Sequence, residues 1–190
     1  MFPILVTSNA KKADEIKLVL GPIKTVALST PEIQSTDESA VAIDKAKKAY
    51  KIVKRPLLVE DVGLHLDCLK GFPGALIKPL LETVGVEGIC SVAGKLKNRG
   101  VWAGISVVFY DGKTTKLFTQ RIYGTIAANT NRKYLYKFDW NTIFIPKNRS
   151  KTLAEFPISS LILRKAVYTK VRLWLQKNNQ ADTRIKKQTI

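Results

Sequence analysis

Short apolar runs alternate with amphipathic segments over the first 60 residues, and this alternation constrains the fold more than any other feature. Each apolar run is bounded by polar or turn-forming residues, as is typical of a buried strand. The expected strands are FPILVT (2–7), KTVAL (24–28) and LLVE (57–60). The expected helices between them cover 11–20, after the capping residues Ser8 and Asn9, and 38–54. Strands that alternate with helices in this way predict an α/β fold.

The middle of the chain adds a hairpin to this pattern. VWAGISVVFY (101–110) and KLFTQRIYGTIA (116–127) flank Asp111-Gly112, a hairpin turn signal. Before the hairpin we expect a turn at Val62-Gly63, a short strand over 64–69, a tight loop at 70–74 and helices over 75–84 and 86–95. The sheet is therefore predicted to be mixed.

The end of the chain is predicted to close the fold with one helix. After a loop over 128–137, residues 160–176 carry an apolar stripe that indicates an amphipathic helix. Residues 178–190 are polar and are expected to be loose. We therefore expect a single domain over residues 1–177, followed by a basic polar tail over 178–190.

The charge of the chain is large and unevenly placed. Its formal net charge is +17. Residues 1–100 hold 15 Lys and Arg against 11 Asp and Glu, whereas residues 101–190 hold 17 against 4. This balance admits a nucleic-acid binder, a membrane-surface binder or a protein that handles phosphates. Because acids are scarce in the second half, carboxylate chemistry is expected in the first.

Cysteine content and hydropathy indicate the compartment. The two cysteines, Cys68 and Cys90, form neither a metal cluster nor a disulfide framework, which favours a reducing compartment. No apolar run approaches the roughly 20 residues that a membrane helix needs, and MFPILVTSNAKK does not resemble a signal peptide. We expect a soluble cytoplasmic protein that does not interact with membranes.

The first candidate site is the segment Thr7-Ser8-Asn9-Ala10-Lys11-Lys12, which joins a strand to a helix. Such a junction presents free backbone N–H groups and the positive end of the helix dipole, which suit an anion. An ordinary capped helix with solvated lysines has the same spacing, and the spacing alone favours that alternative.

The second candidate site is Glu60-Asp61, directly after a buried strand. Adjacent side chains there point to opposite sides, so one can face a cleft while neighbours hold the other. Carboxylates at a strand end suit Mg²⁺, and Glu32 in an earlier loop could join them. Two solvated acids in a turn are the alternative.

Further candidates lie in two loops. Gly and Pro in Lys70-Gly71-Phe72-Pro73-Gly74, followed by Lys78, make a rigid turn that could hold a substrate. The segment Phe138-Asp139-Trp140-Asn141 could stack on a nucleobase and bind it, although Trp140 also suits the core. The one histidine, His65, is expected to be either a surface residue or hydrogen-bonded, rather than catalytic, and no Ser-His-Asp or Cys-His system can be assembled.

Taken together, these segments resemble the inosine triphosphate pyrophosphatase (Ham1-like) family over about residues 3–175. The matching motifs, in chain order, are Thr7-x-Asn9-x-x-Lys12, Pro31-Glu32-Ile33-Gln34, Lys45-Ala46, Val59-Glu60-Asp61-Val62-Gly63, Gly71-Phe72-Pro73-Gly74 with Lys78, and Ala154-Glu155-Phe156. Each motif is short, but their common order makes the resemblance specific.

The resemblance implies a homodimer with a long curved mixed sheet flanked by helices, and two lobes around a central cleft. It implies Mg²⁺-dependent hydrolysis of nucleoside triphosphates, such as inosine and xanthosine triphosphates and their deoxy forms, to a monophosphate and pyrophosphate.

The resemblance also implies roles for single residues. Phosphates would be held by Thr7, Ser8, Asn9 and Lys12. The metal would be organised by Glu32, Glu60 and Asp61, and Asp61 would accept the proton of water, so Asp61, Glu60 and Lys12 form the expected catalytic set. Charge would be neutralised by Lys45 and Lys78, and the base would be bound by Phe138, Asp139, Trp140 and Asn141.

Departures from the family pattern gather in the expected base pocket. Asn141 stands where the family has an acid, and Asp139 stands where it has a small residue. The family's Ser-His-Arg segment has no histidine here, and Arg164 or Lys170 can stand in for its arginine. We therefore expect pyrophosphohydrolysis with altered or relaxed base choice. A catalytically degenerate nucleotide binder, or a basic nucleic-acid-binding protein on the same fold, is the alternative.

Overall fold

The computed structural model describes residues 2–130, 139–156 and 163–188, with side chains up to residue 178. The helices are α1 (Ala10–Leu20), α2 (Glu38–Val53), α3 (Ile77–Lys95) and α4 (Lys165–Gln188). The strands are β1 (Ile4–Val6), β2 (Thr25–Val26), β3 (Leu57–Leu66), β4 (Pro73–Gly74), β5 (Gly100–Tyr110), β6 (Thr115–Ile126) and β7 (Phe144–Pro146). Short 3-10 turns are η1 (Asp67–Leu69), η3 (Trp140–Thr142) and η4 (Leu153–Glu155).

The strands form one seven-stranded mixed sheet in the order β2-β1-β3-β5-β6-β7, with β4 paired to β3. β1 is parallel to β2 and to β3, and the remaining pairs are antiparallel. The predicted α/β fold with a mixed sheet is therefore confirmed, including the hairpin at Asp111-Gly112.

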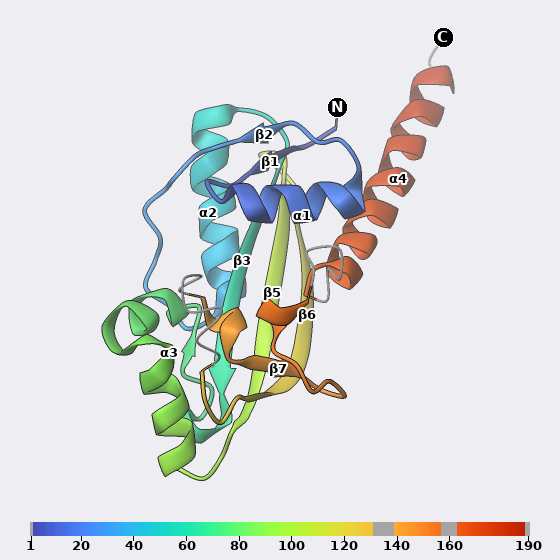
Figure 1. Cartoon of the computed structure of the whole chain (residues 1–190). Helices are drawn as coiled ribbons and strands as arrows, with labels where there is room; N and C mark the ends of the chain where they lie inside the picture. Colours follow the sequence, from blue (N-terminus) through green and yellow to red (C-terminus); the bar gives the residue numbers. More distant parts are fainter. Residues whose placement is uncertain (1, 131–138, 157–162, 189–190) are drawn as a thin grey trace.

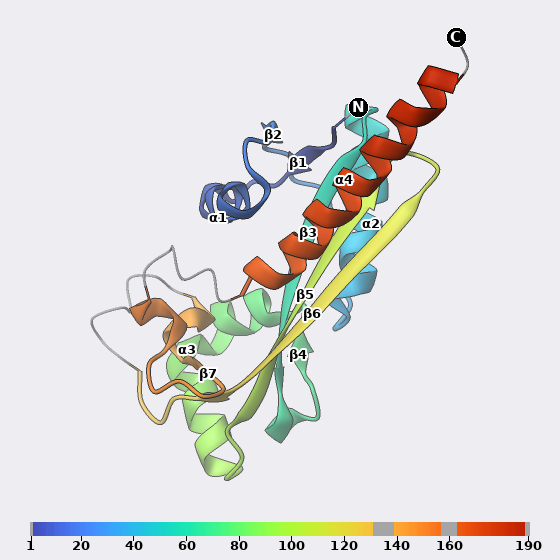
Figure 2. The ribbon, with the colours of Figure 1, turned by 90° about the vertical axis from the view of Figure 1, so that its right-hand side faces the viewer.

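Helices cover both faces of this sheet. On one face α2 packs Ala42, Ala46 and Ala49 against β1, β3 and β5, because its small residues allow a close approach. On the other face, α1 and α4 pack against each other and close the larger core. Figure 2 shows α1, α2 and α4 at one end of the long strands, and α3, β4 and β7 at the other. Residues from both ends therefore meet along the middle of β3.

The third strand is longer than predicted. β3 runs without interruption from Leu57 to Leu66 and pairs with β5 at every position, so the predicted turn at Val62-Gly63 is wrong. Gly63 lies opposite Gly104, and this pair leaves space on the sheet for the carboxylate of Glu38. Gly63 thus lies within a strand, where the absence of a side chain allows the Glu38 carboxylate to approach closely, and it does not form a turn.

The structure confirms the helices predicted within α3 and corrects the predicted end of α4. The two helices expected over 75–84 and 86–95 are found within α3, where Gly85 (φ +66) separates them. The expected end of the last helix near residue 176 is wrong, because α4 continues to Gln188. Residues 177–188 contain neither Gly nor Pro, so nothing local stops the helix. Figure 1 shows this helix extending past the sheet.

None of the helices in the described ranges is both long and apolar enough to cross a membrane.

Candidate active site

The junction between β1 and α1 positions Lys12. Asn9 caps α1: its Oδ1 accepts from the backbone N of Lys12 at 3.1 Å. The Oγ1 of Thr7 accepts from the backbone N of Asn9 at 3.1 Å, and Ser8 is exposed. The capped helix weighed as an alternative is therefore present. It also sets Lys12 on the first turn of α1, facing the sheet.

Glu60 on β3 lies at the centre of a buried ion-pair network. The Nζ of Lys12 lies 3.3 Å from Glu60 Oε1. The guanidinium of Arg164 binds both Glu60 oxygens, with Nη2 2.9 Å from Oε1 and Nε 3.0 Å from Oε2, and it also pairs with Glu15. Burial acts to raise the pKa of Glu60, but the charges of Arg164 and Lys12 outweigh it and lower this pKa to about 2. Glu60 is therefore ionised throughout the physiological range.

Asp61, the next residue, is held by a different lysine. Lys45 Nζ lies 3.3 Å from Asp61 Oδ1 and 2.7 Å from Glu32 Oε1. Burial raises the pKa of Asp61 to about 6, although Lys45 and Lys12 act to lower it. Burial also acts to lower the pKa of Lys45, but its two acidic neighbours raise it. Adjacent carboxylates thus point to opposite sides, one ionised and one poised to take up a proton.

The carboxylates of Glu32 and Asp61 suit a metal ion that binds together with the phosphates of a substrate. Within the described ranges, no three His, Cys, Asp or Glu residues are grouped closely enough to hold a metal by themselves. The carboxylates of Glu32 and Asp61 nevertheless both contact the ammonium of Lys45, so the two acids lie on either side of one positive charge. Mg²⁺ commonly uses one or two carboxylates together with substrate phosphates. The donor set therefore suits a Mg²⁺–triphosphate complex.

The segment η3 lies near this network. Asn141 Nδ2 donates to Asp139 Oδ2 at 2.6 Å, and Asn141 Oδ1 is buried with no partner in the described structure. Burial raises the pKa of Asp139, although the nearby charges of Lys12 and Arg164 oppose this. Trp140 is buried and packs edge-on against Phe144 at 5.6 Å, a core position. Phe138 lies outside the described residues.

Lys78, which follows the 70–74 loop, does not contact Glu60 or Asp61. The side chain of Lys78 is 83% exposed and pairs with Glu82 on the same helix. The loop instead contacts His65, whose Nδ1 lies 3.0 Å from the Gly71 carbonyl oxygen. The described structure thus separates Lys78 from Lys12 and Lys45, with which the motifs had grouped it.

Two acids, the buried Glu38 and the half-buried Glu15, and one arginine take part in polar contacts that the motifs did not indicate. Glu38 binds His65 Nε2 at 2.9 Å, so His65 is hydrogen-bonded, as expected. Glu15 completes the network around Arg164; its position three residues after Lys12, on one side of a helix, was the available signal. Of the two candidates for the family's arginine, Arg164 joins the network, whereas Lys170 is exposed.

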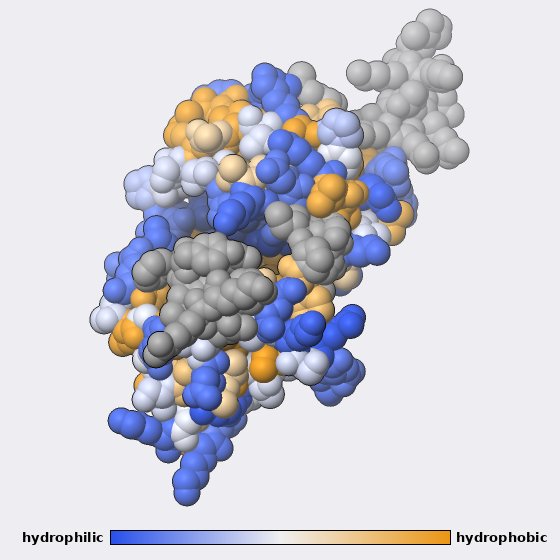
Figure 3. Space-filling model, in the orientation of Figure 1, coloured by the Kyte–Doolittle hydropathy of each residue, from blue (hydrophilic) through white to orange (hydrophobic). Residues whose placement is uncertain are grey.

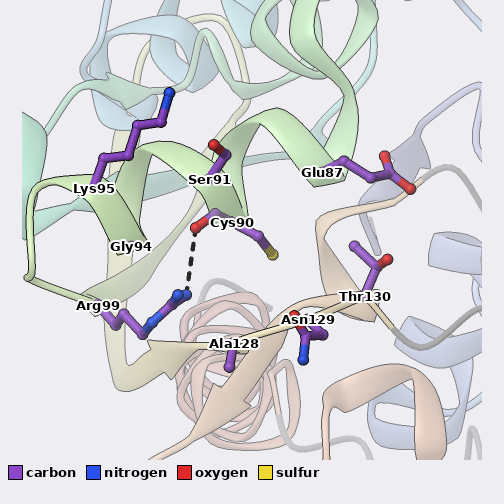
Figure 4. A pocket seen from close by; sticks show the side chains of 9 residues that line it. All are labelled: Glu87, Cys90, Ser91, Gly94, Lys95, Arg99, Ala128, Asn129 and Thr130. Carbon is purple, nitrogen blue, oxygen red and sulfur yellow. Dashed lines mark hydrogen bonds between the residues drawn. The ribbon is translucent and has the colours of Figure 1, made fainter.

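A separate hollow of about 610 Å³ lies between α3 and the chain that follows β6 (Figure 4). Arg99 points along its wall, with its Nη1 donating to the carbonyl oxygens of Cys90 at 3.4 Å and Ala127 at 2.8 Å. Lys12, Lys45, Glu60 and Asp61 do not line this hollow. In Figure 3, hydrophilic residues are spread over the displayed face, with apolar residues between them.

Comparisons with known proteins place the chain in a family. The sequence matches the Ham1 family over residues 3–160. It is 34% identical to an inosine triphosphate pyrophosphatase of Yarrowia lipolytica, covering 82% of this chain and 84% of the relative. It is 31% identical to a dITP/XTP pyrophosphatase of Hyperthermus butylicus, covering 80% and 81%. A Ham1 protein structure from Coxiella burnetii superposes with a TM-score of 0.70 at 19% identity, covering 97% of this chain and 100% of that one. The chain belongs to the Ham1 family.

Proposed function

We propose that this protein is a nucleoside triphosphate pyrophosphatase that converts non-canonical purine triphosphates to the monophosphate and pyrophosphate. The observation that carries the proposal is the pairing of Lys12 with Glu60 and of Lys45 with Asp61 on adjacent positions of one strand. This arrangement offers cations for a triphosphate beside a carboxylate that can take up a proton. The names of the Yarrowia and Hyperthermus relatives support this reaction class.

The reaction balances with the groups present. A water oxygen bonds to the α-phosphorus, the bond from that phosphorus to the α–β bridging oxygen breaks, and pyrophosphate leaves with the bond electrons. Asp61 accepts the proton of water, for which the pKa of about 6 in the ligand-free protein is suited. Lys12 and Lys45 offset negative charge that develops on the phosphate oxygens.

We propose that Mg²⁺ accompanies the triphosphate and that Glu32 and Asp61 bind it. Bound by these two carboxylates, the ion would supply charge neutralisation on the phosphates. Glu60 was also expected as a ligand, but both of its oxygens are already bound by Arg164 and Lys12. We therefore assign to Glu60 the positioning of these two cations.

Base choice is proposed to depend on Asp139 and Asn141. Their mutual hydrogen bond orients the amide so that Asn141 Oδ1 remains a buried acceptor. Such an acceptor favours a base edge that carries an N–H group. Because the family's acid is replaced by an amide here, we expect relaxed choice among purine triphosphates.

We further propose, from the family resemblance, that the protein is a homodimer. The free cysteines, Cys68 and Cys90, support a reducing compartment such as the cytoplasm. Light scattering on the purified protein tests the first proposal, and a tagged chain followed by fractionation tests the second.

The decisive experiment measures product formation from ITP, XTP, dITP, GTP and ATP with Mg²⁺. The expected products are pyrophosphate and a monophosphate, with the highest kcat/KM for ITP or XTP. Release of inorganic phosphate alone would contradict the proposed bond cleavage. If a folded protein binds ITP in a thermal-shift assay but turns over none of the five, the chain is a nucleotide binder without catalysis.

A further inference from the structure

Residues 101–190 carry far more basic than acidic side chains. Only four acids accompany 17 Lys and Arg residues in this part. Asp111 accepts from the backbone of its own turn, Asp139 binds Asn141, and Glu155 caps η4. In the described portion of this half, Arg164 is the one Lys or Arg residue that forms an ion pair. Several of the other basic side chains there, including those of Lys116, Lys170 and Lys177, are exposed.

Several of these basic residues gather where α4 crosses β6. Lys170, Trp174 and Lys177 share one side of α4, because their spacings of four and three residues follow the helical repeat. Lys170 Nζ lies 3.5 Å from the Thr119 carbonyl oxygen on β6. Lys116 Nζ lies 6.0 Å from the Phe118 ring, and the Trp174 ring packs on the same ring at 5.7 Å. We call Lys116, Lys170, Trp174 and Lys177 the α4–β6 patch.

The α4–β6 patch combines two kinds of group that bind single-stranded nucleic acid. Lys170 and Lys177 are seven residues apart, about 10.5 Å along the helix, which can span successive phosphates of a strand. Trp174 lies between them and is half-buried against Phe109 and Phe118, so a base would contact the part of this side chain that remains exposed. Grooves that bind single strands pair lysines along the backbone with aromatic rings that stack on bases.

An anionic membrane is a poorer partner for this surface. Binding in the plane of a membrane requires a helix with a free apolar face. The apolar side of α4, which includes Val167, Val171 and Leu175, is buried against the sheet. The helix then continues as QKNNQADTRIKKQ, a polar and basic sequence, past the sheet. Figure 1 shows this extension leading away from the body, where a long polyanion can reach it.

We propose that the α4–β6 patch binds single-stranded nucleic acid through its phosphodiester backbone. The patch is separate from the network of Lys12, Lys45, Glu60 and Asp61, so nucleic-acid binding does not depend on the proposed pyrophosphatase reaction. The shared chemistry is the phosphodiester chain, and both DNA and RNA strands supply it.

The experiment measures fluorescence anisotropy of labelled 20-mers of oligo-dT and oligo-rU that carry a 5′-hydroxyl, so that the triphosphate site has no terminal phosphate to bind. Affinity is measured from about 50 to 200 mM salt, the range over which counterion release is evident. The K116Q/K170Q/K177Q variant is expected to bind at least tenfold more weakly at the middle of this range. Its log–log salt slope should fall in magnitude by about 2, from about 0.7 for each lost phosphate contact.

A matched control separates a local surface from general charge. K24Q/K47Q/K51Q removes the same charge from three exposed lysines of the first half. This control should bind within about twofold of wild type. W174F, which keeps an aromatic ring against Phe118, should weaken binding to both strands with little change in salt slope. Turnover of ITP should be unchanged in all three variants, which verifies the fold.

Three outcomes would overturn the proposal. One is the absence of binding at the lowest salt. Another is an equal loss of affinity in the two triple variants, which would assign binding to net charge. The third is binding to phosphatidylserine vesicles, lost in K116Q/K170Q/K177Q, without binding to either oligonucleotide. Binding to only one of the two strands, with the expected lysine dependence, would support the proposal and identify the source.

Discussion

Arg164 donates hydrogen bonds to both carboxylate oxygens of Glu60, with Nη2 2.9 Å from Oε1 and Nε 3.0 Å from Oε2, although the two residues are 104 positions apart in the chain. Both side chains are nearly inaccessible to solvent, at 9% and 2% exposure. The contact joins the residue before α4 to the middle of β3. It therefore links the stability of the fold to the charge of the candidate site.

We expect Arg164→Met to lower the free energy of unfolding by about 3–5 kcal/mol, because removal of one partner leaves a buried charge uncompensated. Urea denaturation of the metal-free protein measures this. Arg172→Met is the matched control, since Arg172 is exposed and donates to the Val19 carbonyl oxygen; it should cost less than about 1 kcal/mol. Equal losses in the two variants would remove the special role of the Arg164 pair.

The depressed pKa of Glu60 predicts an acid-sensitive contribution to stability. The folded pKa of about 2 lies below the ordinary value of 4.5, so this contribution is fully present above pH 4.5 and is lost as the pH falls towards 2. Its size is about 3 kcal/mol from the shift in pKa. Unfolding free energies of wild type and Glu60→Gln, measured with EDTA between pH 5 and 2.5, should converge as the pH falls. Parallel curves would show that Glu60 does not carry the effect.

Asp61→Asn should lower kcat/KM for the best substrate at least 100-fold, because the amide cannot accept the proton of water. Pyrophosphate release measures the rate, and a thermal melt within a few degrees of wild type shows that the fold survives. Asp67→Asn, an exposed acid just after the same strand, should retain full activity. A rate within a factor of three of wild type in Asp61→Asn would exclude Asp61 as the base.

Glu32→Gln should raise the Mg²⁺ concentration for half-maximal activity at least fivefold while it lowers saturated kcat less. The reason is that Glu32 and Asp61 both contact the ammonium of Lys45, and in the proposed site Glu32 would supply one of the two carboxylates for the ion. Turnover is measured at a fixed ITP concentration and varied Mg²⁺. Glu82→Gln, which removes an exposed carboxylate beside Lys78, should leave the Mg²⁺ dependence as it is.

Gly104→Ala should be strongly destabilising. A Cβ at this position would lie 1.9 Å from Glu38 Oε1, a buried carboxylate bound to His65. We expect a loss of at least 2 kcal/mol, as in other cases of an overfilled core. At Gly94 in α3, the added Cβ would lie 2.7 Å from Nη2 of Arg99, the end of a flexible side chain that can shift, so Gly94→Ala should cost less than about 1 kcal/mol. Thermal denaturation compares the two, and an equal loss would remove the steric argument.

The sequence predicted most elements of the fold because their signals are local. Apolar runs, capping residues and the Asp111-Gly112 turn each act over a few neighbours. The turn predicted at Val62-Gly63 was wrong because the local sequence cannot distinguish a turn glycine from one that leaves space for a distant side chain, here that of Glu38. The error at the end of α4 arose because loss of the apolar stripe does not end a helix that contains good helix formers.

The sequence by itself indicated the family through the order of its motifs, the α/β class through its alternating elements, and the single candidates Lys12, Lys45, Glu60 and Asp61. Only the tertiary structure decided which cation holds which carboxylate. Arg164 lies 104 residues from Glu60, and no local pattern can distinguish it from Lys170. The same packing set Lys78 outside the network and raised the pKa of Asp61, since burial and charge depend on distances in space rather than along the chain.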